Sequence, residues 1–134
     1  MSKKIKVFFR YQFPAITWAL LIFIGSAIPS RYFPTMKIFR YDKLIHIGLF
    51  LVFGLFVYRA INSIIQKYLF NWGIAFISLS IVMLYGVLDE MHQGFVPGRS
   101  VDIWDAIADT IGGFSAMIII YLLSLRTRTS SVEN

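Results

Sequence analysis

Long stretches without a charged side chain are the feature that most constrains the fold of this 134-residue chain. Tyr11 to Ser30 contains no charged residue across 20 positions, and Tyr68 to Leu88 contains none across 21. A helix needs about 20 apolar residues to cross the hydrocarbon core of a bilayer, because each residue advances it by about 1.5 Å. Both stretches are therefore predicted to be transmembrane helices.

Two shorter apolar stretches bring the number of predicted spans to four. The spans are residues 11–30, 42–61, 68–90 and 103–125. Hydrophobic residues make up 57% of the chain, which is too high a share for an ordinary soluble domain. Residues 1–134 are predicted to form a single all-α domain, an integral membrane four-helix bundle whose first partner is the lipid bilayer.

A secretory signal peptide is the alternative for the first stretch, because Gly25, Ser26 and Ala27 place small residues near a possible cleavage point. We favour an uncleaved helix, because the apolar run is long and bulky for a signal peptide.

The distribution of basic residues predicts how the chain is oriented. Four spans put both ends of the chain on one side of the membrane, and that side carries eight Lys and Arg residues against five on the other. Since Lys and Arg accumulate in cytoplasmic segments, both the N and the C terminus are predicted to be cytoplasmic.

The net charge of +6 does not predict a nucleic-acid partner, because the basic residues flank apolar segments and form no dense patch among exposed aromatic residues. The chain contains no cysteine, which excludes disulfides, thiol nucleophiles and cysteine-bound metals.

Acidic residues are concentrated where the third span ends and the fourth begins. Five of the seven Asp and Glu residues lie between Asp89 and Asp109. If the third helix continues to Gln93, then Asp89, His92 and Gln93 share one face, and Glu90 is rotated from it by about 100°. Carboxylates at a membrane boundary are costly, so this cluster is the first candidate for function.

The fourth and second helices carry matching polar faces. The fourth helix has acidic residues at i, i+3 and i+7, and the second has an acidic residue and a histidine at i and i+4. These residues are Asp102, Asp105 and Asp109, and Asp42 and His46. A turn at Pro97 and Gly98 folds the fourth helix back against the third, so three polar faces are expected to meet near the outer side of the membrane.

Such a cluster suits acid–base catalysis or metal binding. Asp89 or Glu90, with His92 or His46, could move a proton during hydrolysis or group transfer. The same residue types could bind a divalent cation, but the order Asp-Glu-Met-His is not the His-Glu-x-x-His pattern of zinc peptidases. A divalent metal is therefore an alternative that we do not favour, and no cofactor is assigned.

A purely structural role is the competing explanation. Asp102 could cap the fourth helix, and Asp105 and Asp109 suit the positive end of its dipole. Arg99 could pair with these carboxylates. We favour structural support for Asp102 and Arg99, and chemistry for Asp89, Glu90, His92 and Asp109, because ionisable groups beside apolar spans are functional candidates.

Small and aromatic residues have ordinary structural explanations. Gly48 and Gly54 in the second span, and Gly112 and Gly113 in the fourth, would let helices approach closely. Trp72 and Trp104 are expected to anchor at membrane interfaces, and Trp18 to pack inside the bundle.

Four sequence blocks resemble the VanZ-like family of small bacterial membrane proteins. They are DKLIHIG at 42–48, YGVLDEMHQ at 85–93, FVPGRSVDIWD at 95–105 and ADTIG at 108–112. The resemblance implies a four-helix protein of the bacterial plasma membrane. The family takes its name from an accessory factor for resistance to the lipoglycopeptide teicoplanin, and the resemblance implies no settled reaction.

Together, the residues and the resemblance predict an outer-facing site that binds or modifies a cell-envelope component, such as an envelope lipid or a peptidoglycan precursor, and alters teicoplanin sensitivity. The candidate site residues are Asp42, His46, Asp89, Glu90, His92, Gln93, Arg99, Asp105 and Asp109, with Asp102 as a support. The alternatives are a metal-assisted hydrolase or transferase acting on a lipid-linked substrate, an ion-coupled carrier and a non-catalytic scaffold. The carrier is the weakest, because the helices are apolar below the cluster.

Overall fold

The computed structural model describes residues 2–32, 41–65 and 70–130. The elements in chain order are α1 (Lys3–Val7), the π-helical turn η1 (Phe8–Gln12), α2 (Phe13–Ser26), the 3₁₀ turn η2 (Ser30–Tyr32), α3 (Asp42–Ile65), α4 (Trp72–Gln93) and α5 (Ile103–Ser130). The described residues form helices and no strand, so the predicted all-α class is confirmed.

Within the part of the chain that the structure describes, four helical segments are long and apolar enough to cross a membrane. They are Lys3–Ser26, Asp42–Ile65, Trp72–Gln93 and Ile103–Thr127. The first runs through α1, η1 and α2 without a break, and these four segments make the chain a multi-pass membrane protein.

The ends of the helices differ from the predicted spans in ways that local sequence explains. The first helix begins and ends earlier than the predicted 11–30, and it stops at Ser26, three residues before Pro29. The fourth begins at Ile103 as predicted and continues to Ser130. Asn71 caps α4, where its side-chain oxygen accepts a hydrogen bond from the Ile74 backbone at 3.0 Å.

Small residues bring α3 and α5 close together. A Cβ atom added at Gly54 would lie 2.9 Å from the Cβ of Ala116, and one added at Gly112 would meet the backbone carbonyl of Ile47. Gly113 likewise packs against Val82 of α4. The prediction of close approach is confirmed at these three glycines and is wrong for Gly48, where an added Cβ would meet nothing within 4 Å.

Side-chain hydrogen bonds attach α2 to the rest of the bundle. The Tyr85 hydroxyl donates to the Ala19 carbonyl at 2.6 Å, and the Trp18 indole donates to the Leu49 carbonyl at 2.9 Å. Phe50 and Val82 are fully buried in the core between these contacts. The expectation that Trp18 packs inside the bundle is confirmed, and α2 forms a fourth wall beside α3 and α4.

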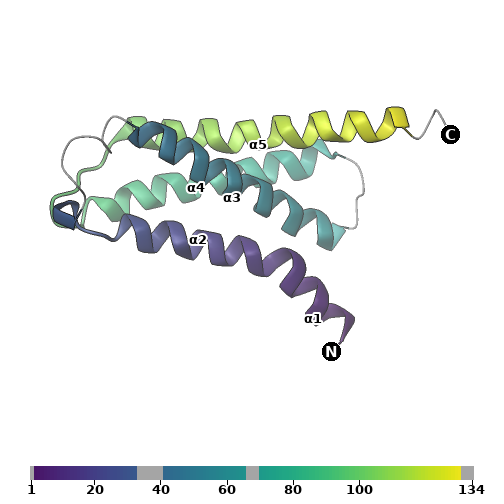
Figure 1. Cartoon of the computed structure of the whole chain (residues 1–134), viewed down its shortest axis with the longest axis horizontal. Helices are drawn as coiled ribbons and strands as arrows, with labels where there is room; N and C mark the ends of the chain where they lie inside the picture. The colour runs from purple at the N-terminus through teal and green to yellow at the C-terminus, as the bar shows by residue number, and fades with distance from the viewer. Residues whose placement is uncertain (1, 33–40, 66–69, 131–134) are drawn as a thin grey trace.

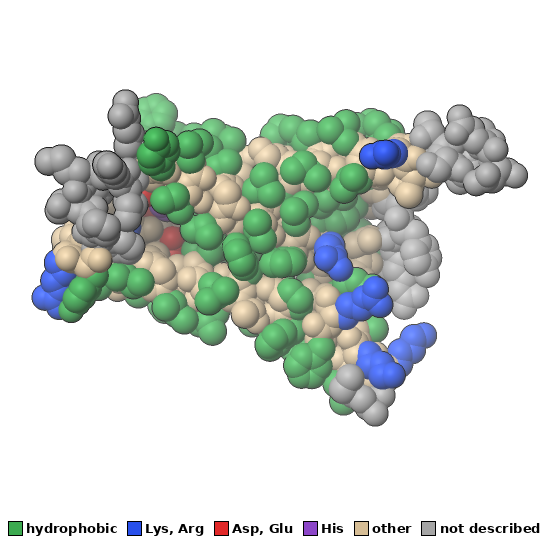
Figure 2. Space-filling model, in the orientation of Figure 1, with side chains coloured by type: hydrophobic (Ala, Val, Ile, Leu, Met, Phe, Trp, Pro, Cys, Tyr) green, Lys and Arg blue, Asp and Glu red, His purple; other side chains and the backbone are tan. Residues whose placement is uncertain are grey.

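The two ends of the bundle differ in composition. Figure 1 shows that the chain begins and finishes at the same end, with the α2–α3 and α4–α5 connections at the other. Figure 2 shows hydrophobic side chains over the flanks and a group of Lys and Arg side chains near the end that holds the termini. Among the side chains that Figure 2 colours by type, acidic atoms are visible in a recess at the opposite end, where some Lys and Arg side chains are visible as well.

Candidate functional site

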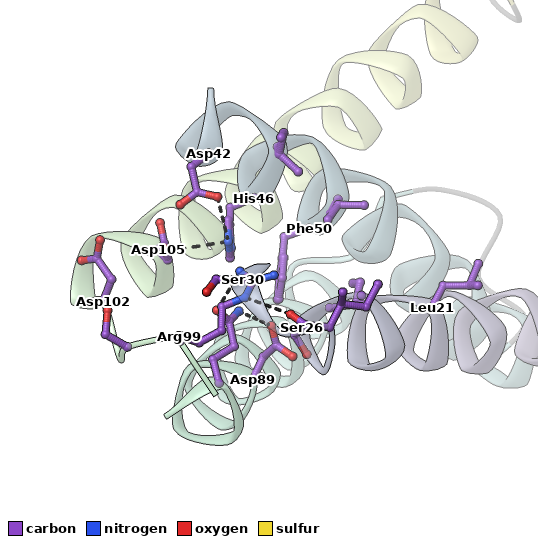
Figure 3. A pocket seen from close by; sticks show the side chains of 18 of the residues that line it. Leu21, Ser26, Ser30, Asp42, His46, Phe50, Asp89, Arg99, Asp102 and Asp105 are labelled. Carbon is purple, nitrogen blue, oxygen red and sulfur yellow. Dashed lines mark hydrogen bonds and ion pairs between the residues drawn. The ribbon is translucent and has the colours of Figure 1, made fainter. Parts of the chain in front are cut away.

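Three helices bring their polar residues together at the end of the bundle that carries the α2–α3 and α4–α5 connections (Figure 3). The first turns of α3 contribute Asp42 and His46, the last turns of α4 contribute Asp89, Glu90 and Gln93, and the first turns of α5 contribute Asp105 and Asp109. All of these side chains except Asp42 are buried. The predicted convergence of three polar faces is therefore present in the fold.

His46 lies at the centre of this cluster. Its Nδ1 atom is 2.8 Å from Oδ1 of Asp109, which is fully buried. Its Nε2 atom is 4.0 Å from Oδ1 of Asp42 and 3.9 Å from Oδ2 of Asp105. A proton on Nδ1 donated to Asp109 leaves the Nε2 lone pair facing the other two carboxylates.

Lys43 is a site residue that the sequence analysis left out. Its ammonium group pairs with Asp102 Oδ2 at 2.6 Å and with Oδ1 of Asp105. The hydrogen bond from Lys43, together with one from the Trp104 backbone, holds the pKa of Asp102 below its usual range. The only sequence signal for this role was the position of Lys43 beside Asp42, within one turn of His46.

Asp102 caps the start of α5 as expected from its position. Its Oδ1 atom accepts the Trp104 backbone N–H at 2.9 Å, and its own backbone N–H donates to Oε2 of Glu90, also at 2.9 Å. The second contact joins the end of α4 to the start of α5. Asp102 therefore orders the connection between two of the helices that carry the cluster.

Gln93 connects the acidic residues of α4 to the loop that follows. Its amide nitrogen donates to Asp89 at 3.3 Å and to Glu90 at 3.4 Å, and its oxygen accepts from Arg99 at 3.4 Å. Arg99 also donates to the Ile28 carbonyl at 3.3 Å, which ties the α4–α5 loop to the end of α2.

His92 lies apart from the cluster. Its ring stacks on Phe23 of α2 with centroids 4.3 Å apart, and its Nδ1 atom is 3.5 Å from the Ser26 hydroxyl. Glu90 instead shares the buried face of α4 with Asp89 and Gln93. The sequence predicted that His92 shares this face and that Glu90 lies outside it. Both predictions are wrong, because α4 is rotated so that Glu90 faces the cluster and His92 faces α2.

A cavity of about 560 Å³ opens beside the cluster. Its polar side includes Asp42, His46, Asp89, Gln93, Arg99, Asp102 and Asp105. Its apolar side is formed by α2 and α3, through Trp18, Leu21, Ile22, Ile45, Leu49 and Phe50. In Figure 2 the recessed acidic atoms are seen from the flank of the bundle. The space therefore suits a molecule with one polar and one apolar end.

The end of α2 and the following turn supply cavity residues that sequence reasoning missed. Ser26 and Ser30 line the cavity, and neither carries a charge that would have marked it. Gly98 also lines it with a positive φ of 78°, and a Cβ there would meet the Ser30 hydroxyl. The turn predicted at Pro97 and Gly98 thus holds the loop against α2.

Two buried carboxylate oxygens have no hydrogen-bond donor among the described residues, namely Oδ1 of Asp89 and Oδ2 of Asp109. Buried polar atoms are nearly always paired, so both mark places where a ligand, an ion or a proton would be stabilised. Two groups have spacing that would suit a metal ion, with ligand atoms within 4.8 Å of one another: Asp42, His46 and Asp105, and His46, Glu90 and Asp109.

Comparison with known protein families gives a match over most of the chain. The model of the VanZ/LLP1 family matches residues 6–124, which include α2, α3 and α4 in full, most of α5 and every residue of the cluster. Neither the curated proteins nor the solved structures contain a match. The family resemblance noted in the four sequence blocks is confirmed.

Proposed function

Because the chain belongs to the VanZ/LLP1 family, we propose that its polar cavity binds a lipid-anchored component of the bacterial cell envelope and thereby alters sensitivity to teicoplanin. The protein would lie in the bacterial plasma membrane with both termini in the cytoplasm, so that the cavity faces outward. The basic residues near the end that holds the termini support this orientation.

The amphipathic cavity is the observation that carries the proposal. Asp42, His46 and Asp105 lie at its polar side, and Leu21 and Leu49 belong to its apolar side. An envelope lipid or a lipid-linked peptidoglycan precursor has the same division, with a polar head joined to hydrocarbon. The head would contact the cluster and the first part of the chain would lie between α2 and α3.

The two histidines of the chain provide a matched test. Wild-type protein and single variants would be expressed in a teicoplanin-susceptible Gram-positive host, and the inhibitory concentration measured. We expect wild type to reduce susceptibility, His46→Ala to abolish the effect, and His92→Ala to keep it, because His92 is not among the residues that line the cavity. The amount of each variant in the membrane fraction controls for insertion.

The result distinguishes a functional cavity from a cluster that serves only as a structural scaffold. If His46→Ala inserts at the wild-type level and keeps full activity, the cavity is not the functional site. If every cluster variant loses activity only in proportion to its folded yield, the cluster serves to hold the helices together.

The pairing of His46 with Asp109 favours a second function, a hydrolase or transferase acting on a lipid-linked substrate. A carboxylate behind Nδ1 fixes the imidazole so that Nε2 can take a proton from a nucleophile in the cavity. Purified protein incubated with labelled envelope lipids would turn them over if it is an enzyme. Binding of the lipids without turnover would support the binding function and count against the hydrolase or transferase.

A further inference from the structure

We propose that Asp42, His46 and Asp105 form a binding site for a divalent transition-metal cation such as Mn²⁺, with His46 coordinating through Nε2. This inference goes beyond the proposed function, because it concerns the chain's own residues and needs neither a lipid nor an antibiotic. A mixed set of two carboxylates and one imidazole suits Mn²⁺ or Zn²⁺ better than Ca²⁺ or Mg²⁺.

The spacing of the three groups supports coordination. The Nε2 atom of His46 is 4.0 Å from Asp42 Oδ1 and 3.9 Å from Asp105 Oδ2, and all three ligand atoms lie within 4.8 Å of one another. An ion between them would be roughly 2.3–2.5 Å from each, so small side-chain movements would reach ordinary metal–ligand distances. Hydrogen bonds would not span these gaps, because they require about 3 Å.

The groups behind the three residues are those that usually orient metal ligands. Oδ1 of Asp109 is 2.8 Å from Nδ1 of His46, so an Nδ1 proton donated to Asp109 would leave Nε2 free to coordinate. Lys43 pairs with Oδ1 of Asp105, so the opposite oxygen, Oδ2, is the one directed at His46. The contact with Asp109 orients the His46 ring, and the contact with Lys43 orients the Asp105 carboxylate. Each leaves the proposed ligand atom directed toward the ion.

An unpaired buried oxygen in the same cavity points independently to a missing ligand. Asp89 is 96% buried, lines the cavity together with the three proposed ligands, and its Oδ1 atom has no donor among the described residues. A divalent cation bound elsewhere in the cavity would attract this carboxylate through space, without direct contact.

The test uses the full chain, purified in detergent micelles, stripped with a chelator and titrated with MnCl₂ while the spin-resonance signal of free Mn²⁺ is recorded. We expect one bound Mn²⁺ per chain, and Asp42→Asn and Asp105→Asn should each weaken binding by about tenfold or more. Glu133→Gln removes an equal charge outside residues 6–124, which contain the whole cluster. Its affinity for Mn²⁺ should stay close to that of wild type.

Nitrogen coordination is tested separately. Pulsed spin resonance of bound Mn²⁺ should show coupling to a histidine nitrogen in wild type and in His92→Ala, and the coupling should disappear in His46→Ala. Since Asp42 is only half-buried, Asp42→Asn gives a folded test even if His46→Ala does not fold, with helicity checked by circular dichroism. The site is refuted if no Mn²⁺ or Zn²⁺ binds, if Asp42→Asn and Asp105→Asn bind like wild type, or if Glu133→Gln weakens binding as much as they do.

Discussion

A Cβ atom on Gly86 of α4 would lie 2.9 Å from Oδ2 of Asp109 on α5. It would also lie 3.0 Å from the Cβ of Asp109, so rotating the carboxylate alone would not relieve the contact. The absence of a side chain at Gly86 is therefore what allows Asp109 to reach His46.

Gly86→Ala tests this packing. We expect it to destabilise the protein by about 1–3 kcal/mol, because an added methyl group in a packed interface forces a shift of the helices. Thermal unfolding in detergent would measure the change. Gly48→Ala is the matched control, because its Cβ meets nothing within 4 Å and alanine favours helix. Equal losses for both variants would contradict the assigned contact.

Asp109→Leu tests the tautomer of His46. The variant keeps the branched shape of the side chain, although with a larger volume, and removes the oxygen that would accept the Nδ1 proton. In nitrogen-15 spectra of histidine-labelled protein, we expect the Nδ1-protonated form of His46 in wild type and a decrease of that form in the variant. The chain has two histidines, so His92→Ala assigns the signals. A His46 spectrum that is unchanged by Asp109→Leu would rule out the pairing.

Tyr85→Phe tests how α2 is attached. The hydroxyl of Tyr85 donates to the Ala19 carbonyl at 2.6 Å, and its loss should cost about 1 kcal/mol of unfolding free energy. Tyr121→Phe is the control, because the described side-chain contacts of Tyr121 are made by its ring, with Phe70 and Trp72. Equal unfolding temperatures for the two variants would show that the hydrogen bond of the Tyr85 hydroxyl does not stabilise the protein.

The pairing of Lys43 with Asp102 predicts an acid-dependent loss of stability. The pKa of Asp102 is lowered in the folded protein, so its contribution is complete above the usual aspartate pKa and is lost as the pH falls through the lowered value. Lys43→Gln should move the pKa of Asp102 upward and reduce this loss. Carbon-13 NMR titration of the Asp102 carboxyl group would be recorded for wild type and for Lys43→Gln. Identical titration curves would show that Lys43 does not lower the pKa of Asp102.

The absence of cysteine makes the orientation directly testable. Ser2 and Ser100 are both exposed and lie in segments near opposite ends of the bundle. If the termini are cytoplasmic, Ser100→Cys should react with a membrane-impermeant maleimide in intact cells, and Ser2→Cys only after permeabilisation. The reverse labelling pattern would invert the proposed topology.

The number of spans and the end at which the polar cluster lies were predictable from sequence. Uncharged stretches of about 20 residues have few alternatives to membrane-spanning helices. Asp42, Asp89 and Asp105 each lie near a helix end, and four antiparallel helices bring those ends together. These conclusions depend on helix length and connectivity, which are local properties of the chain.

The composition of the site could not be predicted as well, because it depends on how each helix is rotated. Glu90 and His92 are both polar residues in the last turn of α4, and the packing against α2 and α5 turns Glu90 inward and His92 toward Phe23. The contribution of Ser26 was missed for a related reason. An uncharged residue at the end of an apolar helix has no distinguishing pattern.

The proposed ligand would reach the cavity along its apolar side, between α2 and α3, and this would set the phase from which it arrives. A molecule that enters past Leu21 and Leu49 would approach by diffusion within the plane of the membrane, and its headgroup would reach His46 without first dissolving in water. Occupancy would then follow the mole fraction of the ligand among the membrane lipids. Diluting the same protein and ligand with inert lipid should lower binding, even when the aqueous concentration of every component is held constant.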